Sequence, residues 1–165
     1  MVAAGGGGTA NGVAGFTLIM SFRDADTGDQ IAFKHDGGRF ETSQRTLKFC
    51  SDTKYKISFK CTPAVEFHNL HIAGSDLELR CDGPARGEYD SVWNTTGINP
   101  TKKGARQDLV VVLKGPGGML KKTLQSKFYQ KAHSHADWGH KLDSLQWTCT
   151  VDPTGNIAVT NEEIR

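Results

Sequence analysis

Apolar and polar residues alternate strictly in several stretches of this chain, and this period-two pattern limits the fold more than any other feature. Between positions 54 and 61, alternate side chains are apolar and the lysines and serine between them fall on the opposite face. The same period returns near position 20 and again from 145 to 151, and no helical period competes with it. We therefore expect an antiparallel sheet whose interior includes Leu18, Met20, Phe22, Tyr55, Ile57, Phe59, Leu145 and Trp147.

Turn-forming clusters of Gly, Pro, Asn and Asp separate these stretches and predict many short strands. Strands are expected over residues 16–22, 30–34, 45–49, 54–61, 65–72, 77–80, 88–93, 109–113, 123–130 and 143–151. Within 65–72 the apolar phase slips, which predicts a β-bulge near His68 and Asn69. The fold class is therefore all-β, a single antiparallel β-barrel or sandwich of about ten strands.

The first 15 residues differ from the rest, because Gly and Ala dominate them and they carry no charge. Such a segment buries too little apolar surface to offset its ordering entropy, so residues 1–15 are predicted to form a flexible tail. Residues 16–165 then form one domain, which is large enough to bury a substantial core.

Twenty basic residues face 18 acidic ones, and the formal net charge of +2 is too small to favour general nucleic-acid binding. Local charge matters more than the total. Lys102, Lys103 and Arg106 fall in one predicted loop and are the candidate residues for partner binding. A second group, at positions 121, 122, 127 and 131, is interpreted as a solvated face.

Cys50, Cys61, Cys81 and Cys149 are widely spaced, lack CxxC pairing and are predicted to be buried thiols. No secretory signal and no apolar run of membrane-spanning length precedes or interrupts them, so a reduced cytoplasmic setting is expected.

His133, His135, Asp137 and His140 crowd one short segment and invite a zinc hypothesis. Their spacing fits neither thiolate nor helical histidine sites, and we expect instead a polar loop whose histidines cap or are solvated, with Trp138 packed onto the barrel end. No metal or cofactor is expected. The sequence also lacks G-x-S-x-G, P-loop, dinucleotide-binding and H-E-x-x-H motifs, so no enzyme is expected.

Several short segments share the order and spacing of a known family. The second half contains 97–107 (GINPTKKGARQ), 125–129 (QSKFY) and 138–139 (WG), and the first half contains 36–40 (DGGRF), 45–48 (RTLK), 55–56 (YK), Pro63 and 72–74 (IAG). In this combination the chain resembles the cannabinoid receptor-interacting protein family from about Phe16 to Cys149.

The resemblance implies a small, non-catalytic cytoplasmic protein that binds the intracellular C-terminal tail of the type 1 cannabinoid receptor and modulates its signalling. It implies a fold similar to the immunoglobulin-like barrel of Rho guanine-nucleotide dissociation inhibitors. A monomer is expected, and the basic loop suits peripheral contact with the anionic inner face of the plasma membrane. Three modes of action stay open, of which one is a purely structural or oligomeric β module and the other two bind a ligand. An extended receptor tail lies beside Lys102, Lys103 and Arg106, or the apolar interior holds the acyl or prenyl chain of a lipidated G-protein or a similar partner.

Overall fold

The computed structural model describes residues 14–35, 45–81 and 87–165 of the chain. Within these ranges there is no α-helix, and one 3-10 turn, η2 (Ser134–Asp137), accompanies a twelve-stranded sheet. The strands are β2 (Ala14–Asp24), β3 (Ala32–His35), β4 (Arg45–Cys50), β5 (Lys54–Thr62), β6 (Asn69–Ile72), β7 (Ser75–Glu78), β8 (Glu88–Asn94), β9 (Gln107–Gly115), β10 (Gly118–Tyr129), β11 (His140–Lys141), β12 (Leu145–Val151) and β13 (Asn156–Ile164).

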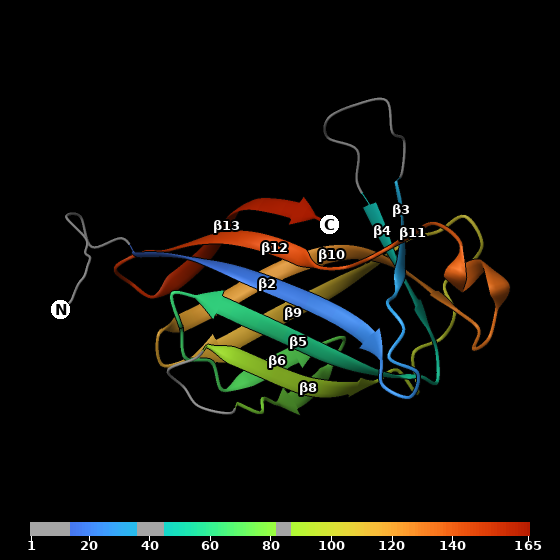
Figure 1. The fold of residues 1–165 in the computed structure, drawn as a ribbon, viewed down its shortest axis with the longest axis horizontal. Coiled ribbons are helices and arrows are strands. Elements are labelled where there is room, and N and C mark those ends of the chain that lie inside the picture. The colour runs from blue at the N-terminus through green and yellow to red at the C-terminus, as the bar shows by residue number, and fades with distance from the viewer. Residues whose placement is uncertain (1–13, 36–44, 82–86) are drawn as a thin grey trace.

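The sheet curls into a nearly closed barrel. Its neighbours run in the order β8, β5, β2, β12, β13, β10, β9, β6 and β7. The two ends of this order, β7 and β8, are joined by an isolated bridge between Arg80 and Asp90. The Ser91 hydroxyl also donates to the Glu78 carbonyl at 2.9 Å. Strands β11, β3 and β4 extend the sheet from the far part of β10 and stand together, with η2 close by, at one end of the barrel (right in Figure 1).

Most strand pairs are antiparallel, as the alternation predicts, but β10 pairs in parallel with both β4 and β13. The β13 ladder involves Met119 and Leu120, whereas the β4 ladder runs from Ser126 to Tyr129. A fully antiparallel barrel was therefore the wrong expectation. A period-two pattern reports which face of a strand is buried and says nothing about the direction of its neighbour.

All ten predicted strand regions contain strand, and two strands were missed. The strand β11 has only two residues, and β13 carries a register shift in which Thr148 opposes Asn161 while Cys149 opposes Val159. The extra residue, Thr160, breaks the alternation that would have revealed β13. The bulge predicted near His68 and Asn69 is wrong, because β6 begins at Asn69 and pairs without a shift, whereas residues 63–68 lie outside the strands.

The eight predicted interior residues are all buried, each with 4% or less of its surface exposed. At the centre of an aromatic cluster, the Phe49 ring lies 5.2–5.5 Å from four other rings. These are the edge-on and stacked distances at which aromatic pairs attract. The Trp93 indole N–H in this cluster has no hydrogen-bond partner among the described residues, so the cluster is held by packing. The expectation of a barrel or sandwich core is confirmed, and its likeness to Rho guanine-nucleotide dissociation inhibitors stays a prediction.

The domain boundary and the cysteines differ from what the sequence predicted. Strand β2 begins at Ala14, two residues before the predicted domain boundary, and residues 1–13 of the predicted tail lie outside the described ranges. Cys61 and Cys149 are buried, and burial raises the pKa of their thiols to about 12 and about 11. Cys81 is exposed and Cys50 half-buried, so the prediction of four buried thiols is wrong. Within the described ranges, no helix combines the length and apolar character that a membrane span requires.

Candidate functional site: a basic–aromatic groove

The outer face of β3, β4 and β10 gathers positive charge from strands that are distant in sequence. Lys48 of β4 lies directly opposite Lys127 of β10. Strand β9 begins at Gln107, which opposes Ser126, so Arg106 lies next to Lys127 on the other side. Three cations therefore occupy neighbouring positions in one row across the sheet. Like charges in adjacent positions destabilise a sheet unless other groups offset them.

Lys48 forms the floor of this region, with only 7% of its surface exposed. Its ammonium donates to the carbonyl oxygens of His135 at 3.1 Å and Trp138 at 2.7 Å, which fastens the η2 turn over β4. The ammonium groups of Lys48 and Lys127 lie 5.5 and 5.6 Å from the centre of the Tyr129 ring. At this range a ring face attracts cations, so backbone dipoles and one aromatic ring keep two ammonium groups close together.

The η2 turn builds the aromatic wall. His133 caps it by accepting a hydrogen bond from the His135 N–H on its ring Nδ1 at 3.1 Å, which confirms the capping role predicted for the histidines. The His135 and Trp138 rings lie 3.9 Å apart, and 58% of Trp138 is exposed. The prediction that Trp138 packs onto the barrel end is wrong, because Lys48 holds the backbone of the turn against β4 and the indole is left on the outside, against His135.

Arg106 is held across the strands by a short polar chain. Its Nε donates to the Thr46 hydroxyl at 3.0 Å, and the Gln125 amide donates to the same hydroxyl at 2.7 Å. Thr46 lies opposite Lys34 of β3. The guanidinium is therefore oriented over the same outer face that carries the lysines.

Two adjoining hollows of about 410 Å³ each open on this face, and they share Lys127, Tyr129 and His135. Among the described residues, neither lining includes an aspartate or glutamate; Asp137 of η2 is outside both. We call the charged and aromatic side chains of these linings, apart from the buried Phe128, the basic–aromatic groove: Lys34, Lys48, Lys103, Arg106, Lys127, Tyr129, His133, His135 and Trp138.

The surroundings of His135 disfavour its charged form. Reduced hydration, the neighbouring His133 and the ammonium groups of Lys48, Lys127 and Lys103 together lower the pKa of His135 below its usual value. Nearby positive charge disfavours the imidazolium, so this shift has the sign that a concentrated cationic surface produces.

The three cations of the predicted loop cluster do not all line the same hollow. Lys103 lines the groove, Lys102 lines a neighbouring hollow of about 630 Å³ that also includes Asp108, and Arg106 lines both. Lys34, Lys48, Tyr129 and Trp138 were not predicted as site residues, and Lys127 was interpreted as part of a solvated face. The one available signal for Lys48 is that a lysine stands in a strand whose neighbouring residues, Leu47 and Phe49, are buried.

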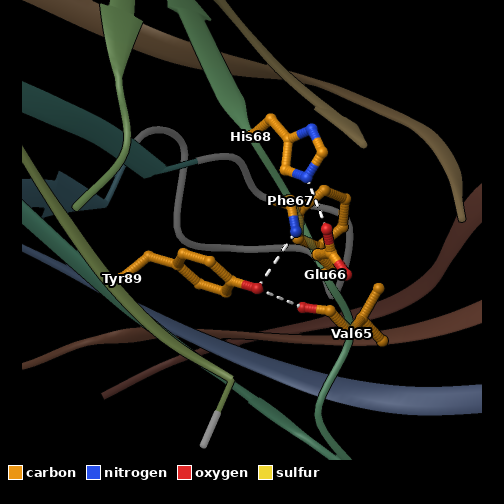
Figure 2. A network of polar contacts seen from close by, with 5 residues as sticks. All are labelled: Val65, Glu66, Phe67, His68 and Tyr89. Carbon is orange, nitrogen blue, oxygen red and sulfur yellow. Dashed lines mark hydrogen bonds and ion pairs between the residues drawn. The ribbon is translucent and has the colours of Figure 1, made fainter. Parts of the chain in front are cut away.

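A second polar cluster, around Tyr89 of β8, shows a different organisation (Figure 2). The Tyr89 hydroxyl donates to the Val65 carbonyl at 2.7 Å and accepts from the Phe67 N–H at 3.0 Å. The His68 ring points to the Glu66 carboxylate at 2.5 Å. These bonds fasten residues 65–68, where no strand ladder satisfies the backbone, so this cluster has a structural role.

Metal chemistry finds no support in the described ranges, where no group of three His, Cys, Asp or Glu side chains converges as metal ligands would. The histidines of the 133–140 segment are spread over the η2 turn and β11, where His140 lies 5.3 Å from His35 ring to ring.

Comparison with known proteins identifies the family of this chain. The family model described as CB1 cannabinoid receptor-interacting protein 1 matches residues 13–164. Proteins of that name from Rattus norvegicus and Mus musculus are each 29% identical over 153 residues, covering 88% of this chain and 93% of theirs. The Homo sapiens protein is 28% identical with the same coverage. The match spans nearly every described residue, including the whole basic–aromatic groove. The chain therefore belongs to the CB1 cannabinoid receptor-interacting protein 1 family.

Proposed function

We propose that this chain is a non-catalytic accessory protein that binds the intracellular C-terminal tail of a cannabinoid-type receptor in the basic–aromatic groove and thereby modulates its signalling. The observation that carries the proposal is the row formed by Lys48, Lys127 and Arg106 beside an exposed Trp138. Of these cations Arg106 is exposed and Lys127 half-buried, and accessible cations suit an acidic extended peptide. Trp and Arg side chains frequently dominate the binding energy of interfaces. Relatives named for interaction with the receptor support the same role.

The proposed function also predicts where in the cell the protein acts. A receptor tail lies in the cytoplasm next to the anionic inner leaflet, which attracts exposed Lys and Arg side chains by about 1 kcal/mol each close to the surface. The protein then acts as a cytoplasmic monomer at the inner face of the plasma membrane. Peripheral contact with that membrane adds to tail binding and is not needed for it.

The test removes charge from the groove and, separately, from a matched surface. One variant carries Lys103→Ala, Arg106→Ala and Lys127→Ala. The control carries Lys54→Ala, Lys56→Ala and Lys60→Ala, three exposed lysines on the outer face of β5, so both variants lose the same charge. Titration of a labelled receptor-tail peptide at several salt concentrations should show at least tenfold weaker binding and a flatter salt dependence for the groove variant alone. Equal affinities for the two variants would refute the assignment of the groove.

The lipid-carrier alternative, in which the interior holds an acyl or prenyl group of a lipidated signalling protein, has less support. Of the eight interior candidates, Leu145 lines a hollow at the surface of the described residues. That hollow, about 360 Å³ between β4, β10 and β13, also has Arg45, Lys122 and Glu162 in its wall. A buried chain of ~14 carbons would contribute on the order of 10 kcal/mol, so the alternative predicts that a myristoylated peptide binds far more tightly than the same peptide without the lipid. Equal affinities for the two peptides would exclude it.

A further inference from the structure

We infer that the outer face of the β9–β10 hairpin binds the anionic headgroups of a lipid bilayer, so that the protein lies with this face against the inner leaflet. The inference rests on the proposed function for the location at the membrane, and on the hairpin itself for the contact surface. We call this surface the hairpin face, and its residues are Val110, Val112, Lys114, Met119, Lys121 and Thr123.

The first argument is the direction of the side chains. On each strand of the hairpin the buried side chains occupy positions of one parity: Leu109, Val111, Leu113, Leu120 and Leu124. Because successive side chains of a strand point to opposite faces, the residues of the hairpin face point outward. Met119 lies opposite Lys114, and Lys121 lies opposite Val112. The outer surface therefore alternates between apolar and cationic side chains across the two strands.

The second argument is charge. Lys114 and Lys121 are exposed, and in the part of the chain that the structure describes no hydrogen bond or ion pair holds their side chains. Asp108, at the start of β9, is the one acidic residue of β9, β10 and the adjacent β6. Close to an anionic leaflet each lysine strengthens binding by about fivefold. An anionic surface therefore complements this face.

The third argument is the apolar area between the lysines. Met119 is 44% exposed, and Val110 and Val112 are half-buried. A lysine stem can lie along apolar surface while its ammonium reaches a phosphate. Binding in the plane of a membrane combines such basic groups with apolar side chains that enter the boundary between headgroups and acyl chains. The mixture on the hairpin face matches that boundary better than it matches a purely charged partner.

The hairpin face also continues into the basic–aromatic groove. Lys121, Thr123, Gln125 and Lys127 occupy every second position of β10 and so lie on one side of the strand. Lys127 belongs to the groove, and about 20 Å of strand separates it from Lys121. A bilayer along the hairpin face therefore lies beside the site proposed for the receptor tail.

The lysines of β5 are a weaker candidate for the same contact. Glu88 of β8 lies directly opposite Lys60, and Asp90 lies opposite Ser58. These carboxylates repel anionic headgroups at the same place where the lysine attracts them. On the hairpin face no carboxylate lies opposite either lysine, because Lys114 pairs with Met119 and Asn69 and Lys121 pairs with Val112.

The experiment measures cosedimentation of the full chain with vesicles in 100 mM salt, without any receptor peptide. One set of vesicles contains phosphatidylcholine and phosphatidylserine in a 7:3 ratio, and the other contains phosphatidylcholine alone. We expect binding to the anionic vesicles only. The double variant Lys114→Ala, Lys121→Ala should lower the partition coefficient at least tenfold, and the matched variant Lys56→Ala, Lys60→Ala on β5 should lower it less than twofold. Unchanged urea midpoints show that both variants are folded.

A second variant, Met119→Thr, tests the apolar part of the contact. It should weaken binding to the anionic vesicles about threefold at both 100 and 300 mM salt. The loss caused by the lysine variant should shrink at the higher salt concentration, because salt screens charge interactions and leaves apolar contacts in place. Binding of Met119→Thr at the parent level would overturn the mixed contact.

The outcomes also separate this inference from the proposed function, which is tested in solution without vesicles. Tail binding without binding to anionic vesicles keeps the proposed function and overturns the hairpin contact. Vesicle binding that the groove variant Lys103→Ala, Arg106→Ala, Lys127→Ala abolishes and the hairpin variant retains overturns it in favour of the groove. Equal losses in the hairpin and β5 variants overturn it in favour of diffuse charge. A loss confined to the hairpin variant supports the inference even if no receptor tail binds.

Discussion

The Tyr89 cluster and the basic–aromatic groove contain similar side chains, but their polar and charged groups have different kinds of partner. Around Tyr89, the hydroxyl pairs with one donor and one acceptor of the chain, and His68 faces the carboxylate of Glu66. In the groove, aromatic rings and backbone carbonyls surround cations, and the described lining offers no carboxylate. The first arrangement is complete within the chain and fixes a segment of backbone. The second brings cations and the exposed Trp138 ring together at the surface.

The largest expected effect concerns the Tyr89 cluster and separates its structural role from binding. Replacing Tyr89 with Phe keeps the ring and removes the hydroxyl, which leaves the buried Phe67 N–H without its acceptor. An unsatisfied buried donor costs about 1–3 kcal/mol, so urea unfolding should show a loss of that size. Affinity for the receptor-tail peptide should stay within twofold of the parent value. A clear loss of binding in a folded variant would show that the Tyr89 cluster also takes part in binding, which contradicts a purely structural role.

The next effect tests the one groove residue that serves both roles. In Lys48→Met the apolar stem is kept, but the charged donor to the His135 and Trp138 carbonyls is lost. We expect about 1–2 kcal/mol of destabilisation together with about fivefold weaker peptide binding, because the η2 wall is released and one charge is removed. If stability falls and binding is unchanged, Lys48 belongs to the scaffold alone.

Lys127 and Lys102 provide a sharper test of the groove itself. Lys102 is exposed and Lys127 is half-buried against the Tyr129 ring, so substitution by Ala should alter the free energy of unfolding by no more than about 1 kcal/mol. Lys127→Ala should weaken peptide binding about fivefold, whereas Lys102→Ala, in the neighbouring hollow, should change it less than twofold. Isothermal titration calorimetry on both variants distinguishes the groove from the loop cluster that the sequence predicted. The opposite ranking would favour the loop.

The smallest expected effect is a pH dependence at His135. Its pKa is lowered by reduced hydration and by His133, Lys48, Lys127 and Lys103. A bound carboxylate peptide offsets these charges and raises the pKa, so affinity is greatest below the pKa of the free protein and the gain disappears above that of the complex. Between pH 7.5 and 5.5 we expect a two- to threefold rise in affinity for an unphosphorylated acidic peptide, whose carboxylates remain charged. His135→Gln should reduce this rise, and an unchanged profile in that variant would exclude His135 as its source.

Sequence reasoning succeeded where one segment contains the whole signal. Alternation along single strands identified eight residues that the structure buries in the core, such as Leu18 and Trp147. It missed β13, since the extra residue Thr160 moves the apolar positions out of phase, and it could not show that β10 runs parallel to β4. Local chemistry was predictable, and strand direction was not.

The groove was only partly predictable for the same reason. Its residues come from β3, β4, the 100–106 loop, the end of β10 and the η2 turn, and only the pairing of these segments brings Lys34, Lys48 and Lys127 together. The loop cluster of Lys103 and Arg106 is contiguous and was visible in the sequence. Lys48 was part of the family motif at residues 45–48, but the sequence alone did not show its role. Its bonds to the η2 carbonyls join positions nearly 90 residues apart, and only the fold brings these together.

The most direct test of the central claim is a map of where the receptor tail binds. Backbone amide NMR signals of the labelled chain are followed while the unlabelled tail peptide is added. The account predicts that the largest shifts fall in β4, in residues 101–106 and from Lys127 to Gly139, with the Tyr89 cluster and the outer face of β5 unaffected. Shifts concentrated in residues 65–68, in β8 or on β5, with the groove signals unchanged, would contradict it.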